Sequence, residues 1–122
     1  MRAVTRVLAV LLLVALSDTH ASLQDTPAAG VQVVEISAER FSFTPSEIRV
    51  RAGTRLELRL RSDDTTHGFH IIGTDIDIEL PKRGRGTTTV EFQPKAGRYT
   101  FECSQLCGAG HEFMRGVIIA TE

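Results

Sequence analysis

The chain has 122 residues, which is enough for one domain but short for two. Its 14 basic and 15 acidic residues leave a formal net charge of −1 at pH 7. This balance excludes the strongly basic surface that nucleic-acid binding requires, so we expect no nucleic-acid partner.

Residues 1–21 have the layout of a secretory signal peptide. Two arginines precede an apolar run from Val7 to Leu16, and small and polar residues then lead to Ala21. The apolar run is shorter than the about 20 residues that span a bilayer, which disfavours a retained membrane anchor. We therefore expect cleavage after Ala21 and a soluble protein in the periplasm or another extracytoplasmic space, with no stable membrane span.

Residues 22–30 are small and polar, and we expect a flexible N-terminal segment there. From residue 31 onward, apolar and polar residues alternate with a period of two, as in strands with one buried face. In chain order, we predict strands at 31–37, two within 41–62 on either side of Ala52-Gly53, and then at 67–75, 76–80, 87–94, 98–103 and 115–121.

The two strands around Gly53 are predicted to form an antiparallel pair. Ile48 and Val50 on the first strand, and three alternating leucines on the second, would be buried, while arginines would face solvent. No stretch of the mature chain has sustained helical periodicity. Residues 31–122 are therefore predicted to form one all-β domain, a β-sandwich of seven or eight short strands.

The segment CSQLCGAGHEFM, residues 103–114, holds both cysteines of the chain together with His111 and Met114. Thiolate, thioether and imidazole groups together favour copper over hard metal ions. A disulfide is the ordinary expectation for two cysteines in an exported chain, but it would not explain His111 or Met114. Zinc bound by both cysteines and two histidines would leave Met114 without a role.

A metal site of this kind needs a ligand from elsewhere in the fold, and His67 in DDTTHGFHI is the candidate. In a sandwich, the strand that carries His67 could lie beside the strand that ends at Cys103. His70 is three residues further along, so strand alternation places it on the opposite face, as a surface histidine. Phe69 and Phe113 could form an apolar wall around the site, whereas Phe101 is predicted to be ordinary core.

Several segments resemble known proteins. PSEIRVRAGTRLELRL, DTTHGF and GRYTFEC are similar to the cupredoxins. CSQLCGAGHEFM has the spacing of the dinuclear CuA centre of cytochrome c oxidase subunit II and nitrous oxide reductase. HGFHIIGTDIDIEL is especially similar to subunit II of the ba-type oxidases. The resemblance covers roughly residues 33–121 and implies a cupredoxin-like Greek-key sandwich with a CuA-like site over 31–122.

The resemblance also implies a ligand set for two copper ions per chain. Its members are His67, Cys103, Gln105 through its backbone carbonyl, Cys107, His111 and Met114. The two cysteines would be bridging thiolates, and each histidine would bind one copper. Asp64, three residues before His67, would either support the site or simply form a turn.

The function that this resemblance implies is one-electron transfer in a respiratory-type chain. A c-type cytochrome or other redox protein would be the partner, with a terminal oxidase as a further partner. We expect no catalytic residues, because no exposed acid–base pair is apparent and the ligand set leaves no open position. Two alternatives stay open at this point: a periplasmic copper carrier or assembly factor for an oxidase, and a membrane-anchored oxidase subunit II.

Overall fold

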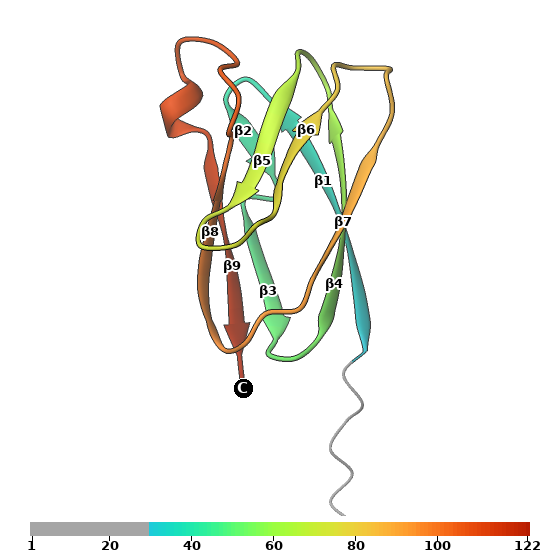
Figure 1. The fold of residues 1–122 in the computed structure, drawn as a ribbon, viewed down its shortest axis with the longest axis vertical. Helices are drawn as coiled ribbons and strands as arrows, with labels where there is room; N and C mark the ends of the chain where they lie inside the picture. Colours follow the sequence, from blue (N-terminus) through green and yellow to red (C-terminus); the bar gives the residue numbers. More distant parts are fainter. Residues whose placement is uncertain (1–29) are drawn as a thin grey trace, which may run out of the picture.

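The computed structural model describes residues 30–122, which fold into two β-sheets packed face to face (Figure 1). The four-stranded sheet has, in spatial order, β2 (Ser42–Thr44), β1 (Val31–Glu39), β4 (Arg55–Ser62) and β7 (Thr88–Phe92). The five-stranded sheet has β3 (Glu47–Arg51), β9 (Arg115–Thr121), β8 (Gly97–Glu102), β5 (His67–Ile71) and β6 (Asp77–Leu80). A 3-10 turn, η1 (His111–Phe113), lies between β8 and β9.

The predicted all-β sandwich is therefore confirmed, with nine strands over the described residues. The predicted signal peptide, residues 1–21, and residues 22–29 of the predicted flexible segment lie outside that range. Over residues 30–122, the structure has no helix long and apolar enough to cross a membrane.

The predicted pairing around Gly53 is wrong, although the predicted buried faces are correct. Ile48 and Val50 on β3 are buried between exposed neighbours, and the leucines of β4 are fully buried. However, β3 pairs in parallel with β9, while β4 lies between β1 and β7. The turn at Gly53, with φ of 80°, carries the chain from one sheet to the other. Alternation predicts which face of a strand is buried but not which strand lies beside it.

Two predicted strand boundaries also need correction. The strand predicted over 67–75 ends at Ile71, because Thr74 Oγ1 donates a hydrogen bond of 2.7 Å to the Ile71 carbonyl and closes a turn. The first strand predicted within 41–62 is divided into β2 and β3, which belong to different sheets. Pro45 lies at this break, where it has no N–H to donate to a neighbouring strand.

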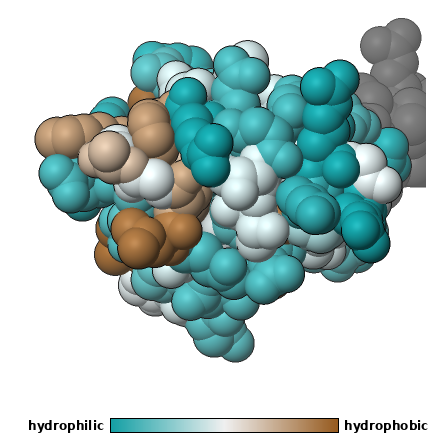
Figure 2. Space-filling model, turned by 90° about the horizontal axis from the view of Figure 1, so that it is seen from above, coloured by the Kyte–Doolittle hydropathy of each residue, from teal (hydrophilic) through white to brown (hydrophobic). Residues whose placement is uncertain are grey.

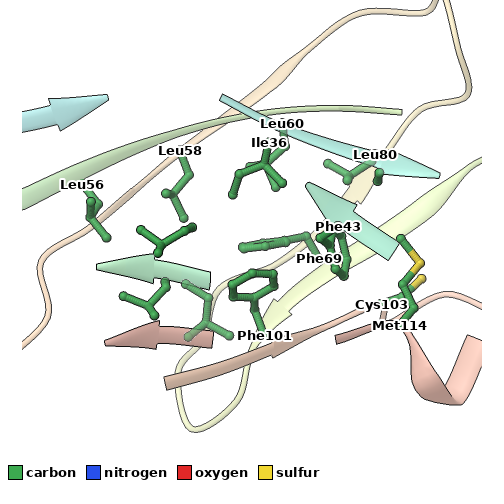
Figure 3. Close-up of a cluster of buried hydrophobic side chains, with 14 of the residues drawn as sticks. Ile36, Phe43, Leu56, Leu58, Leu60, Phe69, Leu80, Phe101, Cys103 and Met114 are labelled. Carbon is green, nitrogen blue, oxygen red and sulfur yellow. The ribbon is translucent and has the colours of Figure 1, made fainter. Parts of the chain in front are cut away.

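The core between the sheets contains three mutually packed phenylalanines (Figure 3). Phe43 packs against Phe69 and Phe101 with ring centroids 5.7 and 5.3 Å apart, and the latter two rings are 5.1 Å apart. Figure 3 shows the sulfur-bearing side chains of Cys103 and Met114 together at one end of this cluster. The apolar core thus extends directly to the segment that carries the predicted ligands.

Residues 103–114, called the ligand loop below, join β8 to β9 at the end of the sandwich opposite the C-terminus (Figure 1). The base of the loop is closed by a hydrogen bond of 3.0 Å from Cys103 N–H to the Met114 carbonyl. The same end receives the start of β5, which is antiparallel to β8, with Ile71 opposite Phe101. This confirms that the strand bearing His67 lies beside the strand that leads to Cys103.

Candidate metal centre

The two cysteines of the ligand loop face each other in the interior. Cys103 and Cys107 are 4% and 5% exposed, and their sulfur atoms are 3.6 Å apart. Both are free thiols, since a disulfide bond would require a separation of about 2.05 Å. The structure therefore has a pair of buried sulfur atoms where a disulfide was one alternative.

His67 lies beside this sulfur pair and is fully buried. Its Nδ1 is 3.8 Å from Cys103 Sγ, while its Nε2 is 2.6 Å from Asp64 Oδ1. Because a carboxylate can only accept, Nε2 carries the proton and Nδ1 presents its lone pair towards the sulfur atoms. The ligand atoms of His67, Cys103 and Cys107 all lie within 4.8 Å of one another.

The remaining predicted ligands divide between the two sulfur atoms. His111 Nδ1 is 3.7 Å from Cys107 Sγ, and Met114 Sδ is 3.9 Å from the same atom. The Gln105 carbonyl oxygen is 3.1 Å from Cys103 Sγ. Each sulfur thus has one imidazole nitrogen and one weaker donor close to it. The structure brings all six predicted residues together, and their role as metal ligands stays a prediction.

The chemistry of the buried donors favours a soft cation. Burial raises the pKa of the Cys107 thiol to about 11, and the neighbouring Cys103 adds to this effect. A bare thiolate is unfavourable here, but a bound metal ion would supply the missing positive charge. A hard ion would not use the fully buried Met114 thioether, whereas copper accepts both thiolate and thioether. The His67, Cys103 and Cys107 cluster therefore fits a copper site.

Asp64 fixes the orientation of the His67 ring. Its Oδ1 accepts a hydrogen bond from the His67 Nε2–H, and its Oδ2 accepts a hydrogen bond of 2.9 Å from the Arg40 backbone N–H. Burial opposes ionisation of Asp64, but the hydrogen bonds from His67, Arg40 and Thr65 outweigh it and hold the pKa of the carboxyl below its ordinary value. Asp64 also lies in a bend of the chain, where its backbone N–H donates to Ser62 Oγ at 3.2 Å. Its contact with His67 agrees with the expected support of the site, and that role stays a prediction.

Three further side-chain contacts hold the ligand loop. Arg40 Nε donates to the Cys107 carbonyl at 2.8 Å. Ser104 Oγ donates to Asp77 Oδ1 at 2.6 Å, and Gln105 Nε2 donates to Glu79 Oε2 at 3.1 Å. No local sequence pattern points to Arg40, Asp77 or Glu79, because each is 26 to 67 residues away from its partner.

Gly68 allows β5 to approach the loop closely. A Cβ atom at this position would collide with Ser104 Oγ and lie 2.8 Å from the Gln105 backbone nitrogen. In its absence, the Gly68 N–H points towards Cys103 Sγ at 3.5 Å. The glycine that follows His67 is thus required for His67 and Cys103 to lie side by side.

Comparison with known proteins identifies the family. Residues 6–120 match the family model described as Cupredoxin-like domain. The chain belongs to the cupredoxin family. It is 35% identical over 89 residues to two sequences of cytochrome c oxidase subunit 2 from Thermus thermophilus. The match covers 73% of this chain, but only 65% and 52% of those two relatives.

Solved structures support the same assignment. The periplasmic domain of cytochrome oxidase subunit II from Bradyrhizobium japonicum has a TM-score of 0.66 at 19% identity, covering 74% of this chain and 83% of that one. A chain of a heme-copper terminal oxidase dimer has a TM-score of 0.62 at 29% identity, covering 74% and 65%. The blue copper protein auracyanin A from Chloroflexus aurantiacus has a TM-score of 0.60 at 20% identity, covering 75% and 100%. At 19% and 20% identity, the likeness shows the fold alone.

One expectation about the surroundings of the site in this cupredoxin is wrong, and another is confirmed. Phe113 is 76% exposed and forms no apolar wall, because η1 directs it outwards. Phe41 instead packs against the loop, and its ring would be 2.9 Å from a Cβ atom at Gly108. His70 lies on the opposite face of β5 from His67, at the surface, with its Nδ1 3.8 Å from Glu102 Oε1.

Proposed function

We propose that this cupredoxin is an electron-transfer protein that holds two copper ions per chain in a CuA-like centre. The observation that carries the proposal is the division of donors between two buried sulfur atoms 3.6 Å apart. His67 lies beside one sulfur and His111 beside the other, at 3.8 and 3.7 Å. A mononuclear blue site would instead gather two histidines and one methionine around a single cysteine.

The residues of the site have distinct tasks in this proposal. Copper, when bound, supplies the one-electron redox chemistry. Cys103 and Cys107 would give up their thiol protons to bind metal, and the His67 Nε2–H would keep its hydrogen bond to Asp64. The sheets hold the loop in one geometry and keep water from the sulfur atoms, so little has to rearrange when the electron arrives or leaves.

The surface over the site fits a docking role. Leu106 and Phe113, both in the ligand loop, are 86% and 76% exposed. Figure 2, which looks onto this end of the molecule, shows apolar surface gathered on one side, with polar and charged surface over much of the rest. Exposed apolar patches rimmed by polar residues are typical of protein–protein contacts. We propose a c-type cytochrome or other redox protein as the partner, and a terminal oxidase as a further partner.

The similarity to subunit 2 of a cytochrome c oxidase and to a periplasmic domain supports an extracytoplasmic location. We accordingly propose that residues 1–21 are a signal peptide, 22–30 a flexible lead-in and 31–122 the copper domain. N-terminal sequencing of the protein from the soluble periplasmic fraction should give Ser22 as the first residue. A membrane-bound protein that begins at Met1 would instead indicate a retained anchor.

An EPR spectrum combined with a copper count tests the centre. We expect two coppers per chain and hyperfine structure from one electron shared over both ions. One copper per chain with a four-line spectrum would overturn the dinuclear proposal. A disulfide between Cys103 and Cys107 that persists when copper is added would overturn copper binding itself. Cys107→Ser is the matched control, because it keeps His67 and Cys103 but should not hold the mixed-valence pair.

A further inference from the structure

Arg40, in the turn between β1 and β2, contacts the supports of both halves of the site. Its backbone N–H donates to Asp64 Oδ2 at 2.9 Å, and the other oxygen of that carboxylate orients His67. Its side-chain Nε donates to the carbonyl of Cys107 at 2.8 Å. One residue, far in sequence from the ligand loop, therefore connects the His67 side of the site to the Cys107 side.

The turn that carries Arg40 is itself seated against the loop. The ring of Phe41 lies so close to Gly108 and Gly110 that a Cβ atom at either position would collide with it or crowd it. Gly108 has φ of 143°, a conformation that other residues rarely adopt. The contact between Arg40 and the Cys107 carbonyl is thus part of a packed interface and is not an isolated surface hydrogen bond.

Arg40 also differs in charge from the other side chains that bond to the site. Within residues 30–122, the charged side chains that bond to His67 or to Ser104 and Gln105 of the loop are acidic. They are Asp64, Asp77 and Glu79. The side chain of Arg40, which bonds to the Cys107 carbonyl, is instead a cation.

We propose that Arg40 is a positioning residue that couples the two halves of the copper site, and that its charge raises the reduction potential. The proposal rests on the proposed copper function and deepens it. The oxidised site carries one more positive charge than the reduced site, whether it holds one copper or two. A nearby cation therefore destabilises the oxidised state, although solvent and salt weaken the effect because Arg40 is exposed.

Three substitutions separate the hydrogen bond from the charge. Arg40→Gln keeps an N–H donor on the same carbon that bears Nε but has no charge. Arg40→Lys keeps the charge with a donor one atom further along the chain. Arg40→Met has neither donor nor charge and fills the space only as far as the Nε position. All three retain the backbone N–H that bonds to Asp64. Arg51→Met, at an exposed position near the other end of the fold, is the control for losing one positive charge.

The reduction potential of the copper site measures the effect of the Arg40 charge. We expect it to fall in Arg40→Gln and Arg40→Met, to stay near wild type in Arg40→Lys, and to change much less in Arg51→Met. Measurements at low and high salt should show a smaller fall at high salt. Equal potentials in wild type and in both neutral variants would overturn the electrostatic part. A fall in Arg51→Met as large as in Arg40→Met would overturn it too.

Copper affinity and thiol accessibility report the positioning. We expect Arg40→Met to weaken Cu(I) binding about tenfold in competition with a chelator, and Arg40→Gln to retain most of it. In the metal-free protein, alkylation of Cys107 should be several-fold faster in Arg40→Met than in Arg40→Gln, because loop opening is easier. Equal Cu(I) affinities and equal Cys107 alkylation rates in Arg40→Met and Arg40→Gln would overturn the positioning role. If wild type binds no copper, the proposed function fails together with the electrostatic part, and the metal-free alkylation rates still decide the positioning.

Discussion

Replacing Asp64 by alanine tests how far the buried His67 ring depends on its carboxylate partner. His67 is fully buried, and its Nε2 proton bonds to Asp64 Oδ1 at 2.6 Å. Removing the acceptor leaves a buried donor without a partner, which costs about 1–3 kcal/mol. The bond from the Arg40 N–H adds little, because Arg40 is exposed and water can replace the carboxylate there. We expect a loss of about 2 kcal/mol, or a fall in melting temperature of about 10 °C.

The assay is urea unfolding of the metal-free, reduced protein, with Asp63→Ala as the matched control. Asp63 is the neighbouring carboxylate and forms an exposed ion pair with Arg61 at 3.0 Å, which is worth about 0–1 kcal/mol. Asp64→Asn, which keeps one acceptor oxygen, should lose about 1 kcal/mol. Copper affinity should fall about 10- to 100-fold in Asp64→Ala. Equal stability of Asp64→Ala and Asp63→Ala would refute the reasoning.

The pH dependence of this difference has a definite sign. The pKa of Asp64 is lower in the folded protein than its ordinary value of 3.8, because its hydrogen bonds outweigh the opposing effect of burial. A carboxyl of this kind contributes stability above its unfolded pKa, and the contribution is lost as the pH falls through the folded pKa. The advantage of wild type over Asp64→Asn should be constant above about pH 5 and shrink below about pH 4. An advantage that grows on acidification would contradict this assignment.

Three further predictions concern the ligand loop. Gly68→Ala should destabilise the fold by about 1–3 kcal/mol in urea unfolding and abolish copper binding, because the new Cβ would collide with Ser104 and displace Cys103. Normal copper binding by this variant would contradict the prediction. Met114→Leu should change the stability of the metal-free protein by less than about 1.5 kcal/mol, because the side-chain volume is conserved. It should raise the reduction potential measured by voltammetry, and an unchanged potential would argue against a thioether ligand. Alkylation of Cys107 in the metal-free protein should speed up about tenfold per pH unit towards a pKa of about 11, and a plateau near pH 9 would contradict this.

The candidate site was predictable from sequence because most of its donors are local. Cys103, Cys107, His111 and Met114 lie within one loop, and few other soft donors exist in the chain. His67 was found by a second argument, that its strand lies beside the strand ending at Cys103, and the pairing of β5 with β8 confirms it. The same alternation that buries His67 also places His70 at the surface.

The supports of the site were not predictable in the same way. Arg40 and Glu79 contact the loop only because the sheets bring distant turns together, and no local pattern announces such contacts. The partners of β3 and β4 were missed for a related reason, since alternation fixes which face is buried but leaves the neighbouring strand undetermined. Phe113 was misassigned because an aromatic residue in a 3-10 turn has no such alternation to place it.

The burial of the three sulfur donors favours the proposed electron transfer over copper delivery. Delivery requires bound metal to leave, yet Cys103 and Cys107 are 4% and 5% exposed and Met114 is fully buried. The loop that would have to open is held by Arg40 at the Cys107 carbonyl and closed at its base by the bond from Cys103 to Met114. We expect these bonds to have to open before a copper ion held by the thiolates could pass to another protein. The proposed electron transfer would need no such opening, because the partner would dock on the exposed apolar residues of the same loop, Leu106 and Phe113. The contacts that would slow delivery are the same ones that would keep the site unchanged during the proposed electron transfer.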